Sequence, residues 1–370
     1  MDIRIERLDP HDSDELNRFV RLERKILGKE RFHVSDFDAD IVDRLAGSSA
    51  FFHDSAVALF IAHKGIHPVG RCAAFIMPRY QKSKRENVGF IGYFAAAADQ
   101  AEAISAMLHD AETWLKLQSV SRVIAPYNGS PFFGYGVMID GFDEEAKVPF
   151  GWNPPWYADY LKSSGYLPRY PLWYYSIDLT SEAFANANRL TTRNHLVKVR
   201  PIRKGHWHED LETIRRLIGL TYTREWAFSE LTSEEMQEYF DSKRPYLSRQ
   251  QVLLAEVEGH TAGFCIGQPC WNAVIRSFEG NIGLRNALKL KHEIHQYDGA
   301  GLIMIGVLRE YRGIGVARSL AVHLYRHYAQ HGQKEAGYYF VNEENTGSRA
   351  FAEMIGGSGS AAYMVYDKML

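Results

Sequence analysis

Two glycines and an arginine in the last third of the chain could bind a phosphate group. The apolar run 302–307 is typical of a buried strand, and it leads through Arg312, Gly313 and Gly315 into a predicted helix. Glycine permits a tight turn in which several backbone N–H groups point at one anion. The first turn of the helix adds unpaired N–H groups and the positive end of its dipole. The loop is therefore predicted to bind phosphate or pyrophosphate.

The helix after this loop is predicted from an apolar stripe. Apolar residues recur at helical spacing from Ala317 to Tyr328, and polar residues fill the other face. Two common glycine-loop motifs do not fit. A Walker loop needs Lys followed by Ser or Thr where Val316 and Ala317 stand. The dinucleotide fingerprint needs a third small residue, for which Ser319 comes too late.

A second segment downstream adds a regular order of elements. A strand is predicted over 338–341, a turn over 342–345 and a helix over 346–355. The helix begins after Asn345 and ends before Gly356, eleven positions further on. The predicted order of elements in the last third of the chain is thus strand, glycine loop, helix, strand, helix.

The two segments together resemble the GNAT superfamily of acyltransferases, in which a loop Arg-x-x-Gly-x-Gly/Ala holds the pyrophosphate of coenzyme A and an Asn opens the closing helix. The resemblance implies a cofactor-binding loop made of Arg312, Gly313, Ile314, Gly315, Val316 and Ala317. It also implies that Asn345 orients the cofactor and that the pantetheine arm pairs with the backbone of Gly306 and Val307. Acetyl-CoA, or another acyl-CoA, is the expected co-substrate, and no metal is expected.

The two halves of the chain close in similar ways. In each, an Asn precedes a helix, a glycine and an aromatic strand, and the two residues, Asn153 and Asn345, are 192 positions apart. Self-similarity at half the chain length indicates two copies of one fold. We expect an α/β (α+β) protein with two GNAT-like domains, 1–185 and 190–370, each a mixed central sheet flanked by helices.

The first copy lacks the phosphate loop. Where the loop should lie, four alanines at 95–98 lead to Asp99 and Glu102 at the start of the next helix. These carboxylates would repel a pyrophosphate, so the domain 1–185 is expected to be a degenerate copy. The long glycine-rich loop 127–143 is a candidate for contact with substrate or with the other domain.

The groups for catalysis are predicted by proximity to the expected thioester. Acyl transfer to an amine needs a base for the ammonium proton and an acid for the leaving thiolate. Many relatives use a Tyr seven residues after the closing Asn, a position held here by Ala352. We therefore expect Tyr339 as the acid and Glu343 as the base. Alternative acids are Tyr338, Tyr363 and Tyr366, and alternative bases are Glu344, Glu279 and His292. An amine that arrives neutral needs no base.

Composition argues against several other classes of protein. A net charge of −2 gives no global field for nucleic acid or an anionic membrane. The apolar run 88–98 is too short to cross a bilayer, and residues 1–8 lack the apolar core of a signal peptide. Three cysteines make no disulfide framework, and His206 and His208 lack zincin spacing. We expect a cytoplasmic protein without nucleic-acid, membrane or metal partners.

The predicted function is an acyl-CoA-dependent N-acyltransferase that acts on a small-molecule or peptide amine by direct attack in a ternary complex. Two alternatives stay open. One is a protein that binds acyl-CoA without turnover, suggested by Ala352. The other is an aminoacyl-tRNA-dependent transferase, a class that also pairs two copies of this fold but usually lacks the Arg-x-x-Gly-x-Gly/Ala loop. The acceptor, the acyl chain length and homodimerisation are left open.

Overall fold

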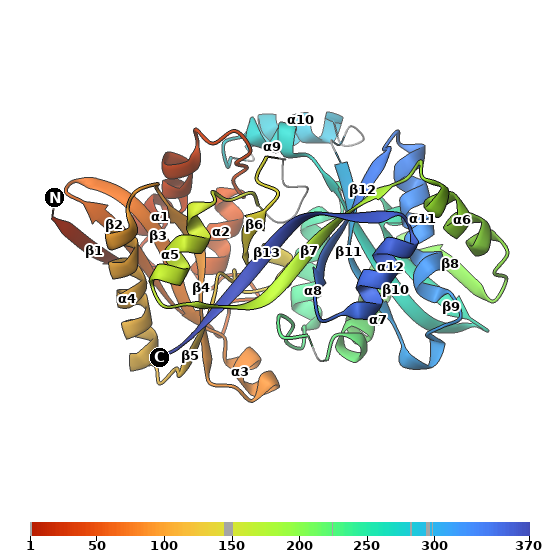
Figure 1. Ribbon diagram of the computed structural model, residues 1–370, viewed down its shortest axis with the longest axis horizontal. Helices are drawn as coiled ribbons and strands as arrows, with labels where there is room; N and C mark the ends of the chain where they lie inside the picture. Colours follow the sequence, from red (N-terminus) through yellow and green to blue (C-terminus); the bar gives the residue numbers. More distant parts are fainter. Residues whose placement is uncertain (1, 144–150, 224, 282, 294–296, 298) are drawn as a thin grey trace. The chain divides into compact units, whose positions relative to one another are not determined.

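The computed structural model describes residues 2–143, 151–223, 225–281, 283–293, 297 and 299–370. The chain forms two compact units (Figure 1). Unit 1 comprises Met1–Pro171, Ala273–Ala287 and Ala362–Leu370, and unit 2 comprises Leu172–Asn272 and Leu288–Ala361. No described helix combines the length and the apolar character needed to cross a membrane.

Unit 1 is a mixed sheet flanked by helices. Its elements are β1 (Ile3–Leu8), α1 (Ser13–Leu27), α2 (Asp38–Leu45), β2 (Ala56–Lys64), β3 (His67–Ile76), α3 (Pro78–Lys84), β4 (Val88–Ala96), α4 (Ala101–Leu117), β5 (Arg122–Ala125), the 3-10 turn Pro131–Phe133, β6 (Val137–Asp140), α5 (Trp156–Ser163) and α9 (Asn272–Arg276). The strand order is β1-β2-β3-β4-β5-β13, in which β13 (Gly357–Met369) comes from the end of the chain and also pairs with β6.

Unit 2 repeats this architecture. Its elements are β7 (Leu167–Asp178), α6 (Glu182–Thr192), β8 (Val197–Pro201), α7 (Trp207–Thr221), α8 (Ser233–Lys243), β9 (Val252–Val257), β10 (His260–Cys270), α10 (Leu284–Glu293), β11 (Gly299–Val307), α11 (Val316–Gln330), β12 (Glu335–Asn342) and α12 (Thr346–Met354), with 3-10 turns at Lys204–His206, Arg249–Gln251 and Arg309–Tyr311. The strand order is β7-β12-β11-β10-β9-β8. The helix and strand expected around the glycine loop are confirmed.

The two halves share one order of elements, as the duplication predicted. Apart from the 3-10 turns, α3 and β6 in the first half and α9 and α10 in the second, both halves follow the order β-α-α-β-β-β-α-β-α-β. It is formed first by β1, α1, α2, β2, β3, β4, α4, β5, α5 and β7, and then by β8, α7, α8, β9, β10, β11, α11, β12, α12 and β13. The two last strands differ in where they pair. Tyr366 of β13 is paired with Ala125 in unit 1, and Trp173 of β7 is paired with Val341 in unit 2.

Each unit therefore takes its closing strand from the other half of the sequence. The expected boundary between 185 and 190 falls inside α6, where Ser181 caps the helix by accepting a hydrogen bond from the Phe184 backbone N–H at 3.1 Å. The polar composition of residues 180–188 suggested the domain boundary at this point. The buried side chains of Phe184 and Ala187 show that α6 is amphipathic and packed instead.

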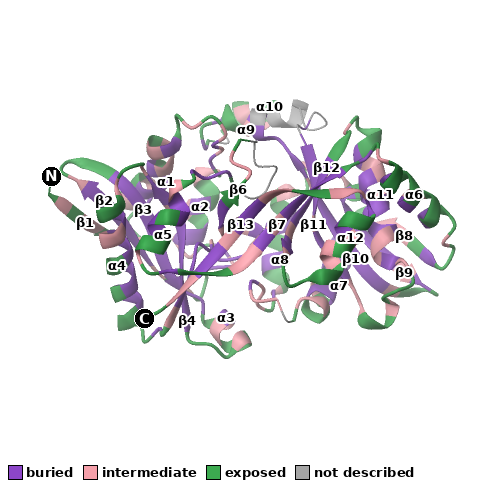
Figure 2. Ribbon diagram, viewed as in Figure 1, coloured by how far each residue is buried: buried purple, intermediate pink, exposed green. Residues whose placement is uncertain are grey.

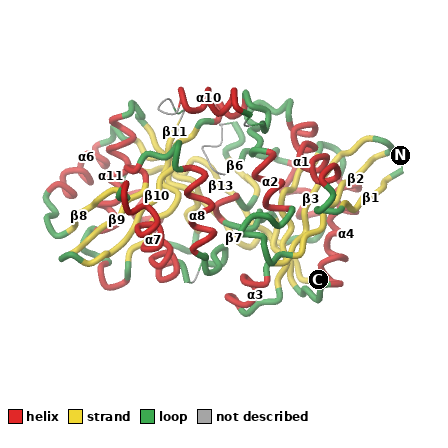
Figure 3. The backbone as a smooth tube through the Cα atoms, turned by 180° about the vertical axis from the view of Figure 1, so that it is seen from behind, coloured by secondary structure: helices red, strands yellow, loops and turns green. Residues whose placement is uncertain are grey.

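Helix α4 forms much of the core of unit 1. Ile104, Met107, Leu108, Ala111 and Leu115 recur at helical spacing and are fully buried in one cluster with residues of the sheet. Figure 2 shows the buried strands of each unit, and Figure 3 shows the helices that cover them. This apolar stripe of α4 is the face that packs on the sheet.

Helix α11 packs on the sheet of unit 2 in the same way. The hydroxyls of two of its tyrosines donate hydrogen bonds to backbone carbonyls of the strands. The Tyr325 hydroxyl donates to the Gly337 carbonyl at 3.1 Å, and the Tyr328 hydroxyl donates to the Gly301 carbonyl at 3.2 Å. A Cβ on Gly267 would lie only 2.3 Å from the Tyr328 hydroxyl. Glycine at 267 is therefore needed for α11 to approach β10 so closely.

A buried carboxylate ties β8 to α7 in unit 2. Asp210 is 1% exposed, and its carboxylate accepts hydrogen bonds from Arg200 Nη1 at 3.0 Å and from the Arg203 backbone N–H at 2.7 Å. Burial alone would raise the pKa of Asp210, but the bonds from Arg203 and Arg200 outweigh it and lower the pKa to about 2. Arg200 also bonds to Glu256 of β9 at 2.7 Å.

Replacement of this carboxylate should destabilise unit 2 in a pH-dependent way. Asp210→Asn leaves two guanidinium groups without their buried partner, so we expect the free energy of unfolding at pH 7 to fall by about 3 kcal/mol. Because the folded-state pKa is depressed, the carboxylate stabilises the fold above pH 3.8, and this contribution is lost as the pH falls toward 2. Urea unfolding at several pH values measures both effects.

The matched control is Glu234→Gln, which removes one exposed carboxylate from α8 in the same unit. Its effect on stability should stay within about 0.5 kcal/mol. A difference between wild type and Asp210→Asn that did not shrink between pH 4 and 2 would contradict the assignment.

Candidate acyl-CoA site

Strands β11 and β12 are parallel but pair over only two residues. Gly301 is opposite Gly337 and Leu302 is opposite Tyr338, and no further register pair follows in the described strands. Beyond that point the strands separate, with a bulge at Ile303 in β11 and a break in register after Tyr338 in β12. The backbone on the facing edges of a separated pair needs other partners. The separation therefore provides a place where an extended ligand can add to the sheet.

The glycine loop begins directly after β11 and has the conformation that a phosphate cradle needs. Gly313 and Gly315 both have positive φ, 84° and 90°, which side-chain-bearing residues rarely adopt. Gly315 is the N-cap of α11, so the N–H groups of the first turn have no partner within the helix. A Cβ on Gly313 would meet nothing within 4 Å. The loop thus offers open space, backbone donors and the helix dipole at one point, and its residues fit a pyrophosphate.

Two residues outside the predicted set complete this loop. Asn194, which follows α6, donates from its side-chain amide to the Ile314 carbonyl at 2.9 Å. Arg318 lies one turn into α11, and its Nη2 is 2.9 Å from where a Cβ on Gly315 would be. Its Nε is buried without a hydrogen-bond partner among the described residues. An anion on the loop would bring acceptors to this guanidinium.

Sequence reasoning had a signal for Arg318 and none for Asn194. Arg318 follows the loop directly, but the helical periodicity placed it only among the polar residues opposite the apolar stripe. Asn194 is 120 positions from Ile314, and only the tertiary structure brings the two together.

The end of β11 presents the backbone of Val307 rather than that of Gly306. The Gly306 carbonyl lies on the β10 side, 2.5 Å from where a Cβ on Gly263 would be. Successive residues of a strand direct their polar groups to opposite edges, so Ile305 and Val307 face the separated edge. The Val307 carbonyl accepts from Arg312 Nε at 3.2 Å. Arg312 thus bonds to the strand end that the resemblance assigns to pantetheine.

Gly306 also has a packing role, and its contact with the cofactor stays a prediction. A Cβ at this position would lie 2.6 Å from Thr221 Oγ1 and 2.4 Å from the Phe264 ring. Next to it, Tyr222 satisfies the backbone of Ile305: its hydroxyl accepts from the N–H at 3.2 Å and donates to the carbonyl at 3.0 Å. Tyr222 was not predicted, and its position after α7 places it on the separated edge.

Asn345 caps the closing helix. Its side-chain carbonyl accepts from the Ser348 backbone N–H at 3.0 Å, which is the geometry of an N-cap. Ala352, at the position where many relatives have a Tyr, is fully buried. The structure therefore gives Asn345 a local structural role, and its contact with the cofactor stays a prediction.

The two predicted catalytic residues differ in exposure. Tyr339 is 5% exposed, and its ring covers Gly301, where a Cβ would lie 1.9 Å from the ring. Glu343 is exposed in the turn after β12. The neighbouring Tyr338 is buried, and burial raises its pKa to about 12, so that this phenol keeps its proton at neutral pH. The roles of Tyr339 and Glu343 stay predictions.

Two of the alternative bases are Glu279 and His292. Glu279 has a positive φ of 49° in the turn after α9, and it belongs to unit 1. The side chain of His292 lies outside the described residues.

The histidines considered for a metal each bond to a carboxylate: His206 Nδ1 to Glu209 at 2.9 Å, and His208 Nε2 to Asp241 at 2.9 Å.

In unit 1 the corresponding strand end is closed by aromatic side chains. Residues 97–100 connect β4 to α4 where residues 308–315 connect β11 to α11. The Ala96 N–H donates to the Tyr157 hydroxyl at 3.0 Å, and the Ala96 carbonyl accepts from the Trp156 indole at 3.0 Å. The Tyr160 hydroxyl donates to the Ala97 carbonyl at 2.8 Å. The groups that a pantetheine arm would use are therefore taken by α5.

Comparisons with known proteins agree with this geometry. Residues 214–356 match the model of the acetyltransferase (GNAT) family. A tandem GNAT protein from the clavulanic acid biosynthesis pathway superposes with a TM-score of 0.59 at 12% identity, over 100% of this chain and 98% of that one. A GCN5-related N-acetyltransferase from Sphaerobacter thermophilus gives 0.55 at 14% identity, over 99% and 95%.

Two relatives match along most of their length. Bacterial ceramide synthase of Caulobacter vibrioides (strain NA1000 / CB15N) is 24% identical over 375 residues, which cover 96% of this chain and 95% of that protein. Protein YghO of Escherichia coli (strain K12) is 24% identical over 321 residues, which cover 84% and 82%. This chain is similar to both over both of its halves.

The separated strands and the glycine loop define an N-acyltransferase fold of the kind that takes acyl-CoA as co-substrate. The matched segment 214–356 lies in the second copy, and the whole chain has the fold of a tandem GNAT protein, with a first copy that lacks the phosphate loop.

The position of Arg318 predicts a contribution to cofactor affinity. Arg318→Gln removes a charge-assisted donor next to the loop, so the dissociation constant for free coenzyme A should rise by about tenfold or more. Calorimetric titration of the full chain measures this. Lys334→Gln, which removes one exposed positive charge from the same unit away from the loop, is the control and should bind as wild type does. Equal affinities of the two variants would exclude a role for Arg318.

A pair of substitutions at Gly315 distinguishes the effect of backbone strain on coenzyme A affinity from the effect of charge. Gly315→Asn and Gly315→Asp introduce side chains of nearly equal size at a φ of 90°, and both displace the ends of Asn194 and Arg318. Only the Asp variant adds a negative charge, so it should bind coenzyme A at least about tenfold more weakly than the Asn variant. If both variants lost affinity equally, the loop would be sensitive to shape and the pyrophosphate assignment would lose its support.

Proposed function

We propose that this protein transfers an acyl group from acyl-CoA to the amine of a long-chain amino alcohol, by direct attack in a ternary complex. The observation that carries the proposal is the glycine loop with Arg318, which fits a pyrophosphate beside a separated strand pair. The similarity to a bacterial ceramide synthase over 96% of the chain supports this class of acceptor, because a ceramide is an N-acylated long-chain amino alcohol.

The donor is proposed to be a fatty acyl-CoA. The same similarity supports this choice, since the acyl group of a ceramide is that of a fatty acid. Acetyl-CoA, expected from the sequence alone, is the alternative donor. Both carry the same pyrophosphate, so the loop accepts either, and the acyl chain alone distinguishes them.

In the proposed reaction the amine nitrogen attacks the thioester carbonyl. A C–N bond forms, the C–S bond breaks, and coenzyme A leaves as a thiolate that takes up one proton. We propose that Glu343 accepts one proton from the incoming ammonium and that Tyr339 donates a proton to sulfur. The second proton that the nitrogen loses as the amide forms restores the Tyr339 phenol. Tyr338 is the alternative acid, since its buried phenol stays protonated at neutral pH.

The proposed location is the cytoplasm. Cys72 and Cys265 are free thiols, and burial raises the pKa of both. Free thiols in the core are typical of proteins in a reducing compartment.

The proposal is tested with the purified full chain, palmitoyl-CoA and sphinganine. We expect release of coenzyme A that depends on the amine, and an N-palmitoyl product detected by mass spectrometry. Hexadecanol, which has a long chain but no amine, should give no release. Acetyl-CoA assayed in parallel decides between the two donors. Coenzyme A binding without acylation of any long-chain amine would favour the alternative of a binding protein without turnover.

The catalytic assignments are tested in the same assay. Glu343→Gln and Tyr339→Phe should each lower kcat by about 100-fold or more, with the affinity for coenzyme A unchanged. Glu344→Gln, in the same exposed turn, is the matched control and should retain activity. Activity that survives in Glu343→Gln would indicate that the amine enters already neutral.

A further inference from the structure

Tyr222 brings a hydroxyl group to the separated edge of β11, and the proposed acyl transfer gives this group no role. The hydroxyl donates to the Ile305 carbonyl at 3.0 Å and accepts from the Ile305 N–H at 3.2 Å. In an antiparallel pair, a neighbouring strand bonds to both groups of one residue in the same way. The hydroxyl therefore stands at a pairing position of the edge, where an extended ligand would pass.

The end of α7 holds Tyr222 in this position. Tyr222 is the C-cap of α7, and its ring packs against Phe228 with the centroids 4.6 Å apart. The ring of Phe264 in β10 lies 6.4 Å away on centroids. Gly306 lets α7 come this close, because a Cβ there would lie 2.6 Å from Thr221 Oγ1. The hydroxyl is thus fixed before a ligand binds, which is what electrostatic stabilisation of a transition state requires.

The bond from the strand makes this hydroxyl a stronger donor. The Ile305 N–H donates to the Tyr222 oxygen, and hydrogen bonds in a chain polarise one another. Tyr222 is partly exposed, so a ligand reaches its hydroxyl without unfolding the end of the helix. Tyr338 and Tyr339, by comparison, are only 4% and 5% exposed. Of these three tyrosines, Tyr222 is the most accessible to a ligand.

The spacing between Val307 and Ile305 matches the end of the pantetheine arm. Both residues face the separated edge, and two residues of strand span about 7 Å. In acyl-CoA, the last amide of pantetheine is followed by two carbons, the sulfur and the acyl carbonyl. With this amide at Val307, where the resemblance to the GNAT superfamily places the arm, these atoms extend along the edge toward Ile305. The acyl carbonyl then lies beside the Tyr222 hydroxyl.

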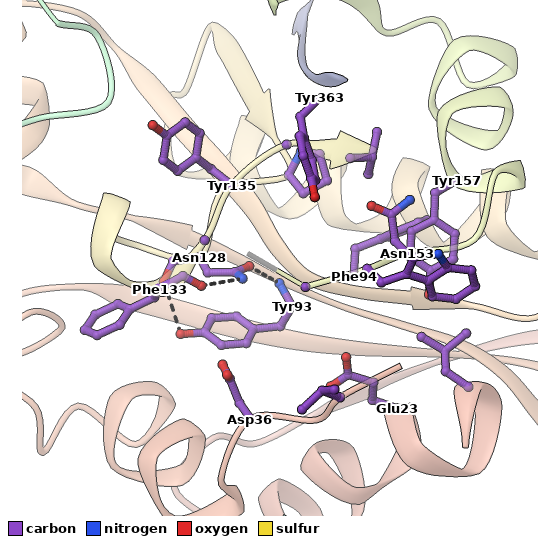
Figure 4. Close-up of a pocket in the computed structure, with 18 of the residues that line it drawn as sticks. Glu23, Asp36, Tyr93, Phe94, Asn128, Phe133, Tyr135, Asn153, Tyr157 and Tyr363 are labelled. Atoms are coloured by element: carbon purple, nitrogen blue, oxygen red, sulfur yellow. Dashed lines mark hydrogen bonds between the residues drawn. The ribbon is translucent and has the colours of Figure 1, made fainter. Parts of the chain in front are cut away.

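Unit 1 has no cofactor loop and covers its separated edge in another way. A cavity of about 130 Å³ lies beside the ends of β4 and β5 (Figure 4). There the Tyr93 N–H donates to the Asn128 side chain at 2.8 Å, a bond drawn in Figure 4. The Ala96 N–H donates to the hydroxyl of Tyr157, which is 3% exposed. Buried side chains therefore cover the edge of the first copy, whereas the second copy presents a partly exposed hydroxyl.

We propose that the Tyr222 hydroxyl donates a hydrogen bond to the acyl carbonyl oxygen of bound acyl-CoA and stabilises the negative charge that forms there when the amine attacks. The acyl oxygen replaces the Ile305 carbonyl as acceptor, and the Ile305 N–H keeps its bond to the Tyr222 oxygen. The Ile305 carbonyl is released to accept from an N–H of the incoming amine. This inference rests on the proposed acyl transfer and adds an oxyanion-binding catalytic residue to it.

Infrared spectroscopy tests the contact directly. Octanoyl-CoA labelled with carbon-13 at the acyl carbonyl has a resolved carbonyl band, and a hydrogen bond to the oxygen lowers its frequency. We expect the band to move to lower frequency when the full chain binds this probe without an amine, and to move less in Tyr222→Phe. Tyr328→Phe removes a hydroxyl that bonds to a strand carbonyl of the same sheet and should give the wild-type shift. Equal shifts in Tyr222→Phe and wild type would overturn the proposal.

A comparison of two ligands isolates the contribution of the carbonyl to affinity. Octanoyl-CoA and S-octyl-coenzyme A carry chains of equal length, and only the first has an acyl oxygen. In calorimetric titrations, Tyr222→Phe should bind octanoyl-CoA about fivefold more weakly than wild type does, as expected for one hydrogen bond. It should bind S-octyl-coenzyme A as wild type does. Equal weakening of both ligands, or tighter binding of octanoyl-CoA, would contradict a contact with the carbonyl.

Turnover separates this inference from the proposed function. With palmitoyl-CoA and sphinganine, Tyr222→Phe should lower kcat by about 100-fold or more, while it binds free coenzyme A as wild type does. Tyr328→Phe should retain activity. A wild-type kcat in Tyr222→Phe would refute this inference alone. If wild type acylates no amine, the proposed function fails, and the infrared shift still decides whether Tyr222 binds the acyl carbonyl.

Discussion

The separation of two parallel strands is the constraint on which both units depend. Register pairing between β11 and β12 ends at Leu302, and that between β4 and β5 ends at Phe90, after which the Tyr127 N–H bonds to the Ile91 carbonyl at 3.0 Å. Backbone groups on the separated edges must still find partners, because an unpaired buried polar group costs free energy comparable to a lost hydrogen bond. What supplies those partners decides what each unit can bind.

The two copies differ in which groups bond to the separated strand ends. In unit 1, side chains of α5 bond to the strand end at Ala96, and the connection to α4 is too short to form a glycine loop. In unit 2, the connection to α11 is long enough for Gly313 and Gly315, and Arg312 bonds to the strand end at Val307. An arginine side chain on the surface can be displaced by a ligand far more easily than buried aromatic rings. The same separation is thus closed in one copy and available in the other.

The exchange of the closing strands makes each unit depend on both halves of the chain. Strand β13 pairs with β5 and β6 in unit 1, and Lys368 near its end bonds to the buried Glu112 at 2.7 Å. Strand β7 pairs with β12 in unit 2. Neither half of the sequence therefore contains a complete sheet. This arrangement gives a physical reason for keeping a copy that has no cofactor loop.

Sequence by itself determined the features that rest on local chemistry. Residues with positive φ must be glycine where the loop turns, and apolar spacing must match the helix that packs, so the loop at 312–317 and the helix after it were readable from residue types. The duplication was readable for the same reason, since both copies repeat one local order. The degenerate first copy followed from the missing glycines and from Asp99 and Glu102.

Only the tertiary structure decided which distant groups meet. Asn194 reaches Ile314 across 120 positions, Tyr222 reaches Ile305 across 83, and the partner of each closing strand lies in the other half. The orientation of a backbone carbonyl depends on strand register, which is why Gly306 faces β10 while Val307 faces the separated edge. The cavity of unit 1 likewise joins residues from α1 to the end of the chain. Such contacts are set by packing between elements, and no local pattern of residues encodes them.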